Sequence, residues 1–211
     1  MTKKIHLTNS PFLVLLGLLL LLSVISYFIP YFNLDISISK MIQNIDSSIF
    51  DQIMRAVSTL GNQPLMVFVV ITGALILFLS GLRREAVISS LFTAIAVLSG
   101  ALVKMIVDRP RPSDSLVRVT SWLTDNSYPS NHTLAFTVFF GFLLYVLLKK
   151  VHRTPLSIFL TIILILLIAT IGISRIYLGV HWASDVAGGY LFGLLWLSGA
   201  IKIYNTSHGQ R

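Results

Sequence analysis

The chain has 211 residues, of which 55% are hydrophobic and 11% are charged, and its formal net charge is +8. A soluble domain carries about 25% charged residues, so this composition points to a protein embedded in lipid. The basic residues stand in short clusters between apolar runs, which is typical of membrane topology signals rather than of a nucleic-acid-binding patch. The chain has no cysteine, which excludes structural disulfides and thiolate metal sites. We therefore expect an integral membrane protein that binds no nucleic acid.

Six apolar runs, each long enough to cross a hydrocarbon core of about 30 Å, predict six transmembrane helices. Their approximate limits are residues 11–31, 65–82, 86–107, 132–148, 156–177 and 182–204. The first run also has the basic start and apolar stretch of a signal peptide, but the residues that follow it offer no small side chains for cleavage. We expect an all-α, six-helix bundle that forms a single domain over residues 1–211.

The segment between the first two runs, residues 34–64, has a different pattern. Apolar residues recur there at helical spacing, first at Ile38, Met41, Ile42 and Ile45 and then at Ile49, Ile53 and Val57. Ser48 with Asp51 predicts a capping box, and Gly61 predicts a C-terminal stop. These signals favour one or two short amphipathic helices in the outer membrane interface, although an ordered loop packed on the bundle fits them equally well.

The basic residues of the short loops predict the orientation of the bundle. With six spans, both termini lie on one side of the membrane. That side also holds most of the basic loop residues, namely Lys3, Lys4, Arg83, Arg84, Lys149, Lys150, Arg153 and Lys202. By the positive-inside rule this side is cytoplasmic, so we expect a plasma-membrane protein with both termini in the cytoplasm.

Ionisable residues close to spanning helices are expensive and are candidates for function. They occur in three clusters, which are residues 104–112, residues 128–132 and residues 174–185. The predicted third and fifth helices end on the outer face of the membrane, and the fourth and sixth begin there. All three clusters therefore meet at the same outer surface.

The cations of these clusters suit a phosphate group. Lys104, Arg111 and Arg175 supply positive charge and several hydrogen-bond donors. Ser130 and Asn131 directly precede a predicted helix, whose free backbone N–H groups and positive dipole end also favour an anion. We expect these five residues to bind phosphate.

The histidines of the clusters suit phosphoryl transfer. His181 and Asp185 are four residues apart, so they share one face of a helix, and the carboxylate can fix the tautomer of the imidazole. The other imidazole nitrogen is then available as a nucleophile, and His132 arrives from a different helix as a general acid. The pattern predicts covalent transfer through a phosphohistidine, followed by attack of water.

Each residue alone also has an ordinary interpretation. Lys104 alone fits a lysine that extends to the membrane interface. Arg109 or Arg111 alone fits a surface ion pair with Asp108 or Asp114. The joint occurrence of these residue types on one face is what favours a functional site.

A zinc site made of His132, His181 and Asp185 is the metal alternative. Three neighbouring cations would repel a metal ion, so we expect no metal and no cofactor.

The clusters resemble the three motifs of the type 2 phosphatidic acid phosphatase superfamily, which includes lipid phosphate phosphatases and vanadium haloperoxidases. The motifs correspond here to Lys104 with Arg111-Pro112, to Pro129-Ser130-Asn131-His132, and to Ser174-Arg175 with His181 and Asp185. Asn131 stands where the family has glycine, and asparagine tolerates left-handed backbone geometry better than most residues.

This resemblance implies the same assignment: His181 as nucleophile, Asp185 as its partner, His132 as general acid, and no metal. It also implies a lipid phosphate substrate such as phosphatidylglycerol phosphate, phosphatidate or undecaprenyl diphosphate. The alternatives are an anion transporter, a haloperoxidase and a family member inactivated by Asn131. The sequence predicts no oligomeric state.

Overall fold

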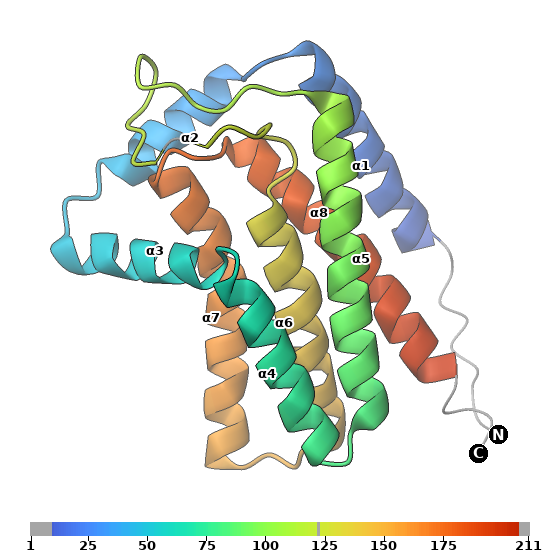
Figure 1. Cartoon of the computed structure of the whole chain (residues 1–211). Helices are drawn as coiled ribbons and strands as arrows, with labels where there is room; N and C mark the ends of the chain where they lie inside the picture. The colour runs from blue at the N-terminus through green and yellow to red at the C-terminus, as the bar shows by residue number, and fades with distance from the viewer. Residues whose placement is uncertain (1–9, 122, 207–211) are drawn as a thin grey trace.

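In the computed structural model, residues 10–121 and 123–206 are described, and over these ranges the chain forms eight helices and no strand (Figure 1). Lys3 and Lys4, used above for orientation, lie outside the described residues. The helices are α1 (Ser10–Phe28), α2 (Asn33–Gln43), α3 (Ser48–Leu60), α4 (Leu65–Leu79), α5 (Arg83–Val107), α6 (Asn131–Lys150), α7 (Pro155–Tyr177) and α8 (Ala183–Thr206). The all-α prediction is confirmed.

Five helices, α1, α5, α6, α7 and α8, are long and apolar enough to cross a membrane. The predicted second span differs, because α4 has only 15 residues and so rises about 22 Å, short of a core of about 30 Å. Taken together, α3 and α4 pass the same test, although they are bent by 70° at the break between them. Over residues 10–121 and 123–206 the bundle therefore has five candidate spans, or six when the bent pair is counted as one.

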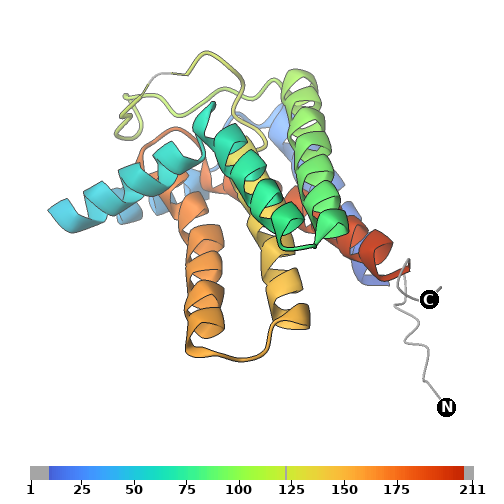
Figure 2. The same cartoon turned by 60° about the horizontal axis from the view of Figure 1, so that its bottom comes forward.

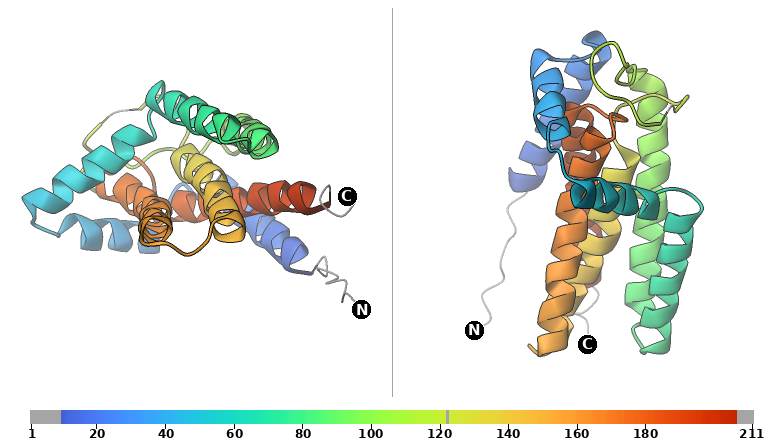
Figure 3. Two further views of the ribbon diagram at one scale, coloured as in Figure 1. Left: turned by 90° about the horizontal axis from the view of Figure 1, so that it is seen from below. Right: turned by 90° about the vertical axis from the view of Figure 1, so that its left-hand side faces the viewer.

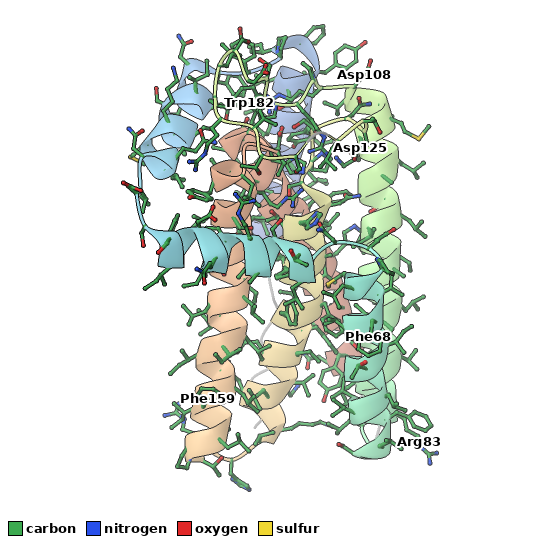
Figure 4. All side chains as sticks on the ribbon, turned by 60° about the vertical axis from the view of Figure 1, so that its left-hand side comes forward. Phe68, Arg83, Asp108, Asp125, Phe159 and Trp182 are labelled. Carbon is green, nitrogen blue, oxygen red and sulfur yellow. The ribbon has the colours of Figure 1, made fainter. Side chains whose placement is uncertain are left out.

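The outer faces of the long helices are apolar. Phe68 on α4 and Phe159 on α7 are exposed and point away from the bundle (Figure 4). Large exposed side chains of the same kind recur along α1, α4 and α7, where they face no protein. Apolar surface of this extent is stable only against lipid, so the chain is a multi-pass membrane protein.

Residues 34–64 form two helices, as one of the two interpretations predicted. The N-cap of α3 is Ser47 rather than Ser48, because the Ser47 hydroxyl accepts from the Phe50 backbone N–H at 3.3 Å. Gly61 is the C-cap of α3, as expected. Figure 1 shows α3 running across the bundle beside α7, where the Phe50 and Tyr177 rings meet edge to face with centroids 5.1 Å apart.

Helix α2 is amphipathic, but it buries polar side chains and exposes apolar ones, the reverse of a surface helix on a soluble protein. Its polar residues Asp35 and Ser39 are buried against the bundle, whereas Leu34 and Met41 are exposed. A helix at a membrane surface can present apolar side chains outward to lipid and direct polar ones toward protein partners. The partners of Asp35 belong to the site described below.

Helix α6 is the centre of the molecule. It contacts α5, α7 and α8, and in the views of Figure 2 and Figure 3 it lies between α7 and the α4–α5 pair. Phe136, Phe139 and Phe142 on α6 are almost completely buried, which makes α6 the core of the bundle. Because α6 is packed on several sides, the direction of its N-terminal end is fixed by its neighbours.

The close approach of α8 to α6 depends on small residues. A Cβ atom added at Gly193 would lie 2.6 Å from the Cβ of Thr137 on α6. Small residues at such contacts let two helices approach closely in a membrane.

We expect Gly193→Ala to lower the thermal unfolding temperature in detergent, because the new methyl group must displace α6, at a cost of about 1–3 kcal/mol. Gly199→Ala is the matched control on the same helix, because its Cβ would lie 3.5 Å from Phe92, an ordinary contact. Equal unfolding temperatures for the two variants would contradict this account of the α6–α8 contact.

Candidate active site

The three motif clusters meet at one end of the bundle. Asp108, Asp125 and Trp182, which flank or belong to the clusters, lie at this end in Figure 4, and Arg83 lies at the other. A cavity of about 1020 Å³ opens among the clusters. Six of the eight predicted site residues line it, namely Lys104, Arg111, Asn131, His132, Arg175 and His181. Asp185 and Ser130 are not among the described residues that line the cavity, and Asp185 lies behind His181.

The chain reaches this geometry through a turn at the end of α5. Asp108 caps α5 in the left-handed conformation, with φ of 48°. The reversal brings Arg111 back over the cavity, where its Nη1 donates to the backbone carbonyl of Val180. The guanidinium is thereby held against the loop that carries His181.

The three cations predicted to bind phosphate surround the cavity, and few protein carboxylates lie close enough to pair with them. Lys104 Nζ lies 3.1 Å from Asp125 Oδ2, and Arg111 Nη2 lies 2.7 Å from Asp125 Oδ1. Arg175 Nη1 donates to Ser58 Oγ at 2.5 Å, while Arg175 Nε is buried without a hydrogen-bond partner. Positive charge in this cavity therefore exceeds the negative charge beside it, as an anion site requires.

Asp125 is a site residue that the sequence interpretation missed. Its carboxylate bridges Lys104 and Arg111, the pair of cations expected to hold phosphate. Partial burial raises the pKa of this carboxyl group, but Lys104 and Arg111 outweigh burial and hold the pKa below its ordinary value. An ionised carboxylate thus lies between two cations where a phosphate oxygen would compete with it.

His181 is placed with one nitrogen toward the cavity and the other toward the protein. Arg111 Nη1 lies 3.3 Å from His181 Nε2, and an arginine can only donate, so Nε2 is the bare nitrogen. Nδ1 then carries the proton, and it lies 3.5 Å from both Ser127 Oγ and Asp185 Oδ2. Burial, and then the cations led by Arg111, keep the pKa of His181 well below its usual range, so the imidazole is neutral.

Asp185 is near His181 as predicted, but its shorter contacts are to other groups. Its Oδ2 accepts from the Ser127 hydroxyl and, at 2.8 Å, from the Trp182 backbone N–H. Its Oδ1 accepts from Arg109 Nη1 at 2.6 Å. Ser127 and Arg109 are both buried, and neither was assigned a role from sequence. Arg109 does not form the surface ion pair with Asp108 or Asp114 that was its ordinary interpretation.

His132 enters the cavity from the first turn of α6. Its Nε2 lies 2.8 Å from Asn62 Oδ1 in the α3–α4 junction. A Cβ atom at the preceding Gly61 would lie 2.4 Å from the His132 ring, so the imidazole is packed against that backbone. Among the residues that the structure describes, no three His, Asp or Glu side chains gather to hold a metal ion.

Ser130 and Asn131 differ in what they present to the cavity. Ser130 is fully buried, its Oγ accepts from Thr133 Oγ1 at 3.1 Å, and it is absent from the described residues that line the cavity. Its part in phosphate binding stays a prediction. Asn131 lines the cavity, and its Oδ1 points at Gly100 of α5, where an added Cβ would be 2.2 Å away.

The comparisons with known proteins agree with this arrangement. Residues 85–208 match the model of the PAP2 superfamily. Phosphatidylglycerophosphatase B of Bacillus subtilis (strain 168) is 30% identical over 168 residues, which cover 76% of this chain and 78% of that protein. Lipid phosphate phosphatase delta of Arabidopsis thaliana is 34% identical over 129 residues, which span 57% of this chain but only 31% of the plant protein.

Solved structures share the fold. The crystal structure of a transmembrane PAP2-type phosphatidylglycerolphosphate phosphatase from Bacillus subtilis superposes with a TM-score of 0.75 at 22% identity, over 94% of this chain and 98% of that one. Aquifex aeolicus LpxE superposes with a TM-score of 0.60, over 81% of this chain and 96% of that one, also at 22% identity. On the family match, the relative from Bacillus subtilis and the three motifs gathered around one cavity, the chain belongs to the PAP2 superfamily.

Proposed function

We propose that this protein is a lipid phosphate phosphatase that hydrolyses a phosphomonoester or diphosphate of a membrane lipid through a phosphohistidine at His181. One observation carries the proposal: a single cavity joins the cation-lined pocket at His181 to an apolar groove between two helices. A phosphate group suits the first part, and a lipid chain suits the second.

The groove runs down between α4 and α5. Its lining includes Val67, Val70 and Ile71 from α4 and Ala94, Val97 and Leu98 from α5. Val67, Ile71 and Leu98 are also exposed on the outside of the bundle, so the groove faces the lipid laterally. From Lys104 to Ser90, the deepest α5 residue in the lining, the helix rises about 21 Å, a length suited to an extended hydrocarbon chain.

In the first chemical step, His181 Nε2 attacks the phosphorus atom held by Lys104, Arg111 and Arg175. The N–P bond forms as the bond from phosphorus to the lipid oxygen breaks. His132 enters this step as the imidazolium, and that oxygen takes the proton from His132 Nε2 when it occupies the position of the Asn62 side-chain oxygen. The Nδ1–H of His181 faces Asp185 and Ser127, which stabilise the positive charge that forms on the ring.

In the second step, water attacks the phosphorus atom of the phosphohistidine. His132, now neutral, accepts a proton from that water, and the N–P bond breaks to release inorganic phosphate and neutral His181. Charge on the phosphoryl oxygens is stabilised in both steps by the three cations. The proposed cycle uses no metal ion.

The orientation of the site is part of the proposal. Arg83, Arg84, Lys149, Lys150 and Lys202 belong to the ends and loops remote from the cavity, and the positive-inside rule assigns that side to the cytoplasm. Both termini are then cytoplasmic, and the cavity faces outward from the plasma membrane.

The substrates to compare are phosphatidylglycerol phosphate, phosphatidate and undecaprenyl diphosphate. The relative with broad coverage from Bacillus subtilis is a phosphatidylglycerophosphatase, which supports testing phosphatidylglycerol phosphate first. The groove carries only apolar and hydroxyl groups below the cations, so it recognises a hydrocarbon chain without specifying its type.

Anion transport is the alternative of a different class. The bacitracin transport permease protein BcrC of Bacillus licheniformis is 42% identical to this chain over 71 residues. The match covers only 34% of this chain. Transport would not need the His181–Asp185 pairing at the head of the cavity. The effect of replacing His181 therefore distinguishes transport from hydrolysis.

We expect purified protein to release phosphate from lipid phosphates in mixed micelles containing EDTA. His181→Ala should reduce release by about 10⁴-fold or more, because the nucleophile is lost. His152→Ala, in the exposed loop between α6 and α7, is the control and should retain full activity. Full activity of His181→Ala, or activity that requires an added metal, would refute the proposal.

The second alternative, inactivation by Asn131, makes a different prediction. The absence of a side chain at Gly100 leaves room for Asn131, whose buried Oδ1 has no hydrogen-bond partner among the described residues. Gly100→Ala should displace Asn131 and lower kcat/KM by about tenfold, and adding Asn131→Gly should recover most of the loss, a coupling expected for residues in contact.

A double-mutant cycle of phosphate release measures this coupling. Additive effects of Gly100→Ala and Asn131→Gly would contradict the contact. A large rise in activity for Asn131→Gly alone would identify the native asparagine as a handicap.

A further inference from the structure

Two carboxylates and one guanidinium form a buried chain behind His181. Arg109 Nη1 donates to Asp185 Oδ1 at 2.6 Å, and Arg109 Nη2 donates to Asp35 Oδ2 at 3.0 Å. The three side chains are 0–3% exposed. Asp35 comes from α2, Arg109 from the loop after α5, and Asp185 from α8, so the chain of charges joins three segments that are distant in sequence.

The remaining polar atoms of this chain of charges are also satisfied. Arg109 Nε donates to the Pro30 carbonyl at 2.9 Å, and the Ser184 hydroxyl accepts from Arg109 Nη1 at 2.7 Å while donating to Asp35 Oδ2 at 2.8 Å. Asp35 Oδ1 accepts from the Ser184 backbone N–H, also at 2.8 Å. Every nitrogen of the guanidinium therefore has a fixed partner.

Burying three charges is costly, and well-packed apolar residues at such positions are often as stable or more so. Stability alone is therefore a weak reason for this chain of charges. Its placement suggests a different reason, since it ends on the oxygen of Asp185 opposite the one that faces His181.

We propose that Arg109 and Asp35 are positioning residues of the reaction, acting through Asp185 to fix the orientation and tautomer of His181. This inference rests on the proposed function of His181 as nucleophile. Arg109 holds Oδ1 so that Oδ2 stays toward His181 Nδ1 and Ser127. The backbone carbonyl of Arg109 also accepts from the Ser127 N–H at 2.8 Å, so one residue places both groups that face Nδ1.

Asp35 has an electrostatic part in this arrangement. A guanidinium paired with Asp185 alone would neutralise the carboxylate that must stabilise a positively charged imidazole. Asp35 offsets the charge of Arg109, and with both carboxylates ionised the trio has a formal net charge of −1. That charge opposes the cations around the ring. The charged and titratable groups facing His181 are Lys104 on α5, His132 on α6, Arg175 on α7, Asp185 on α8, and Arg111 and Asp125 in the α5–α6 loop.

Neither Arg109 nor Asp35 is among the described residues that line the cavity, which separates them from substrate-binding groups. Their loss should therefore lower kcat and leave KM almost unchanged. We expect Asp35→Asn and Arg109→Lys to lower kcat by about 10- to 100-fold, the range typical of residues that orient a functional group from behind. Asp46→Asn, at an exposed position between α2 and α3, is the matched control and should behave as wild type.

A second readout does not depend on catalysis. In protein labelled with ¹⁵N-histidine, the nitrogen chemical shifts report which ring nitrogen carries the proton, and His181→Ala identifies the His181 signals. Wild type should hold His181 in the Nδ1–H form, and Asp35→Asn and Arg109→Lys should shift it toward the Nε2–H form.

Wild-type kcat together with an unchanged tautomer in Asp35→Asn and Arg109→Lys would overturn the inference. If these variants do not fold, Ser184→Ala removes one link and keeps all three charges, and its kcat should fall by about two- to tenfold. Wild-type kcat and tautomer in Ser184→Ala would then count against it. A wild-type protein that hydrolyses no lipid phosphate would refute the proposed function, while the tautomer measurement would still decide this inference.

Discussion

The structure depends on keeping three cations close together at one end of a membrane bundle. Lys104, Arg111 and Arg175 repel one another across the cavity that they line, and the burial of Lys104 and Arg175 weakens the screening of this repulsion by solvent. Asp125 and the backbone carbonyls of Asn126 and Val180 satisfy part of this charge. The rest is left for an anion, and in the proposed function the binding of phosphate offsets the free-energy cost of gathering the cations.

The fold meets this requirement by building the site from helix ends. The C-terminal end of α5 and the last turn of α7 carry cations, the N-terminus of α6 points its first turn at the cavity, and α8 begins with Asp185 in its first turn. The short helices α2 and α3 close the site from the side, with Asp35 reaching Arg109 and Ser58 reaching Arg175. The two helices are thus parts of the site as well as its cover.

The sequence was sufficient for five of the six predicted spans and for the convergence of the motifs, because apolar runs and helix parity are local properties of the chain. It was insufficient for Arg109, whose neighbours Asp108 and Asp114 offered ordinary partners while its actual partners lie 74 and 76 residues away. The inward face of α2 was also hidden, because hydrophobic periodicity does not say whether the apolar side of a helix meets lipid or protein. The shortness of α4 was missed for a related reason, since its apolar run continues to Leu82 while the helix stops at Leu79.

The central claim is that His181 Nε2 takes the phosphoryl group before water does, and the stereochemical course at phosphorus tests it most directly. A lipid phosphorothioate made chiral with oxygen isotopes is hydrolysed in water enriched in the third isotope, and the configuration of the released thiophosphate is determined. Two successive in-line displacements, onto His181 and then onto water, predict overall retention. Inversion, the outcome of a single direct attack by water, would contradict the account.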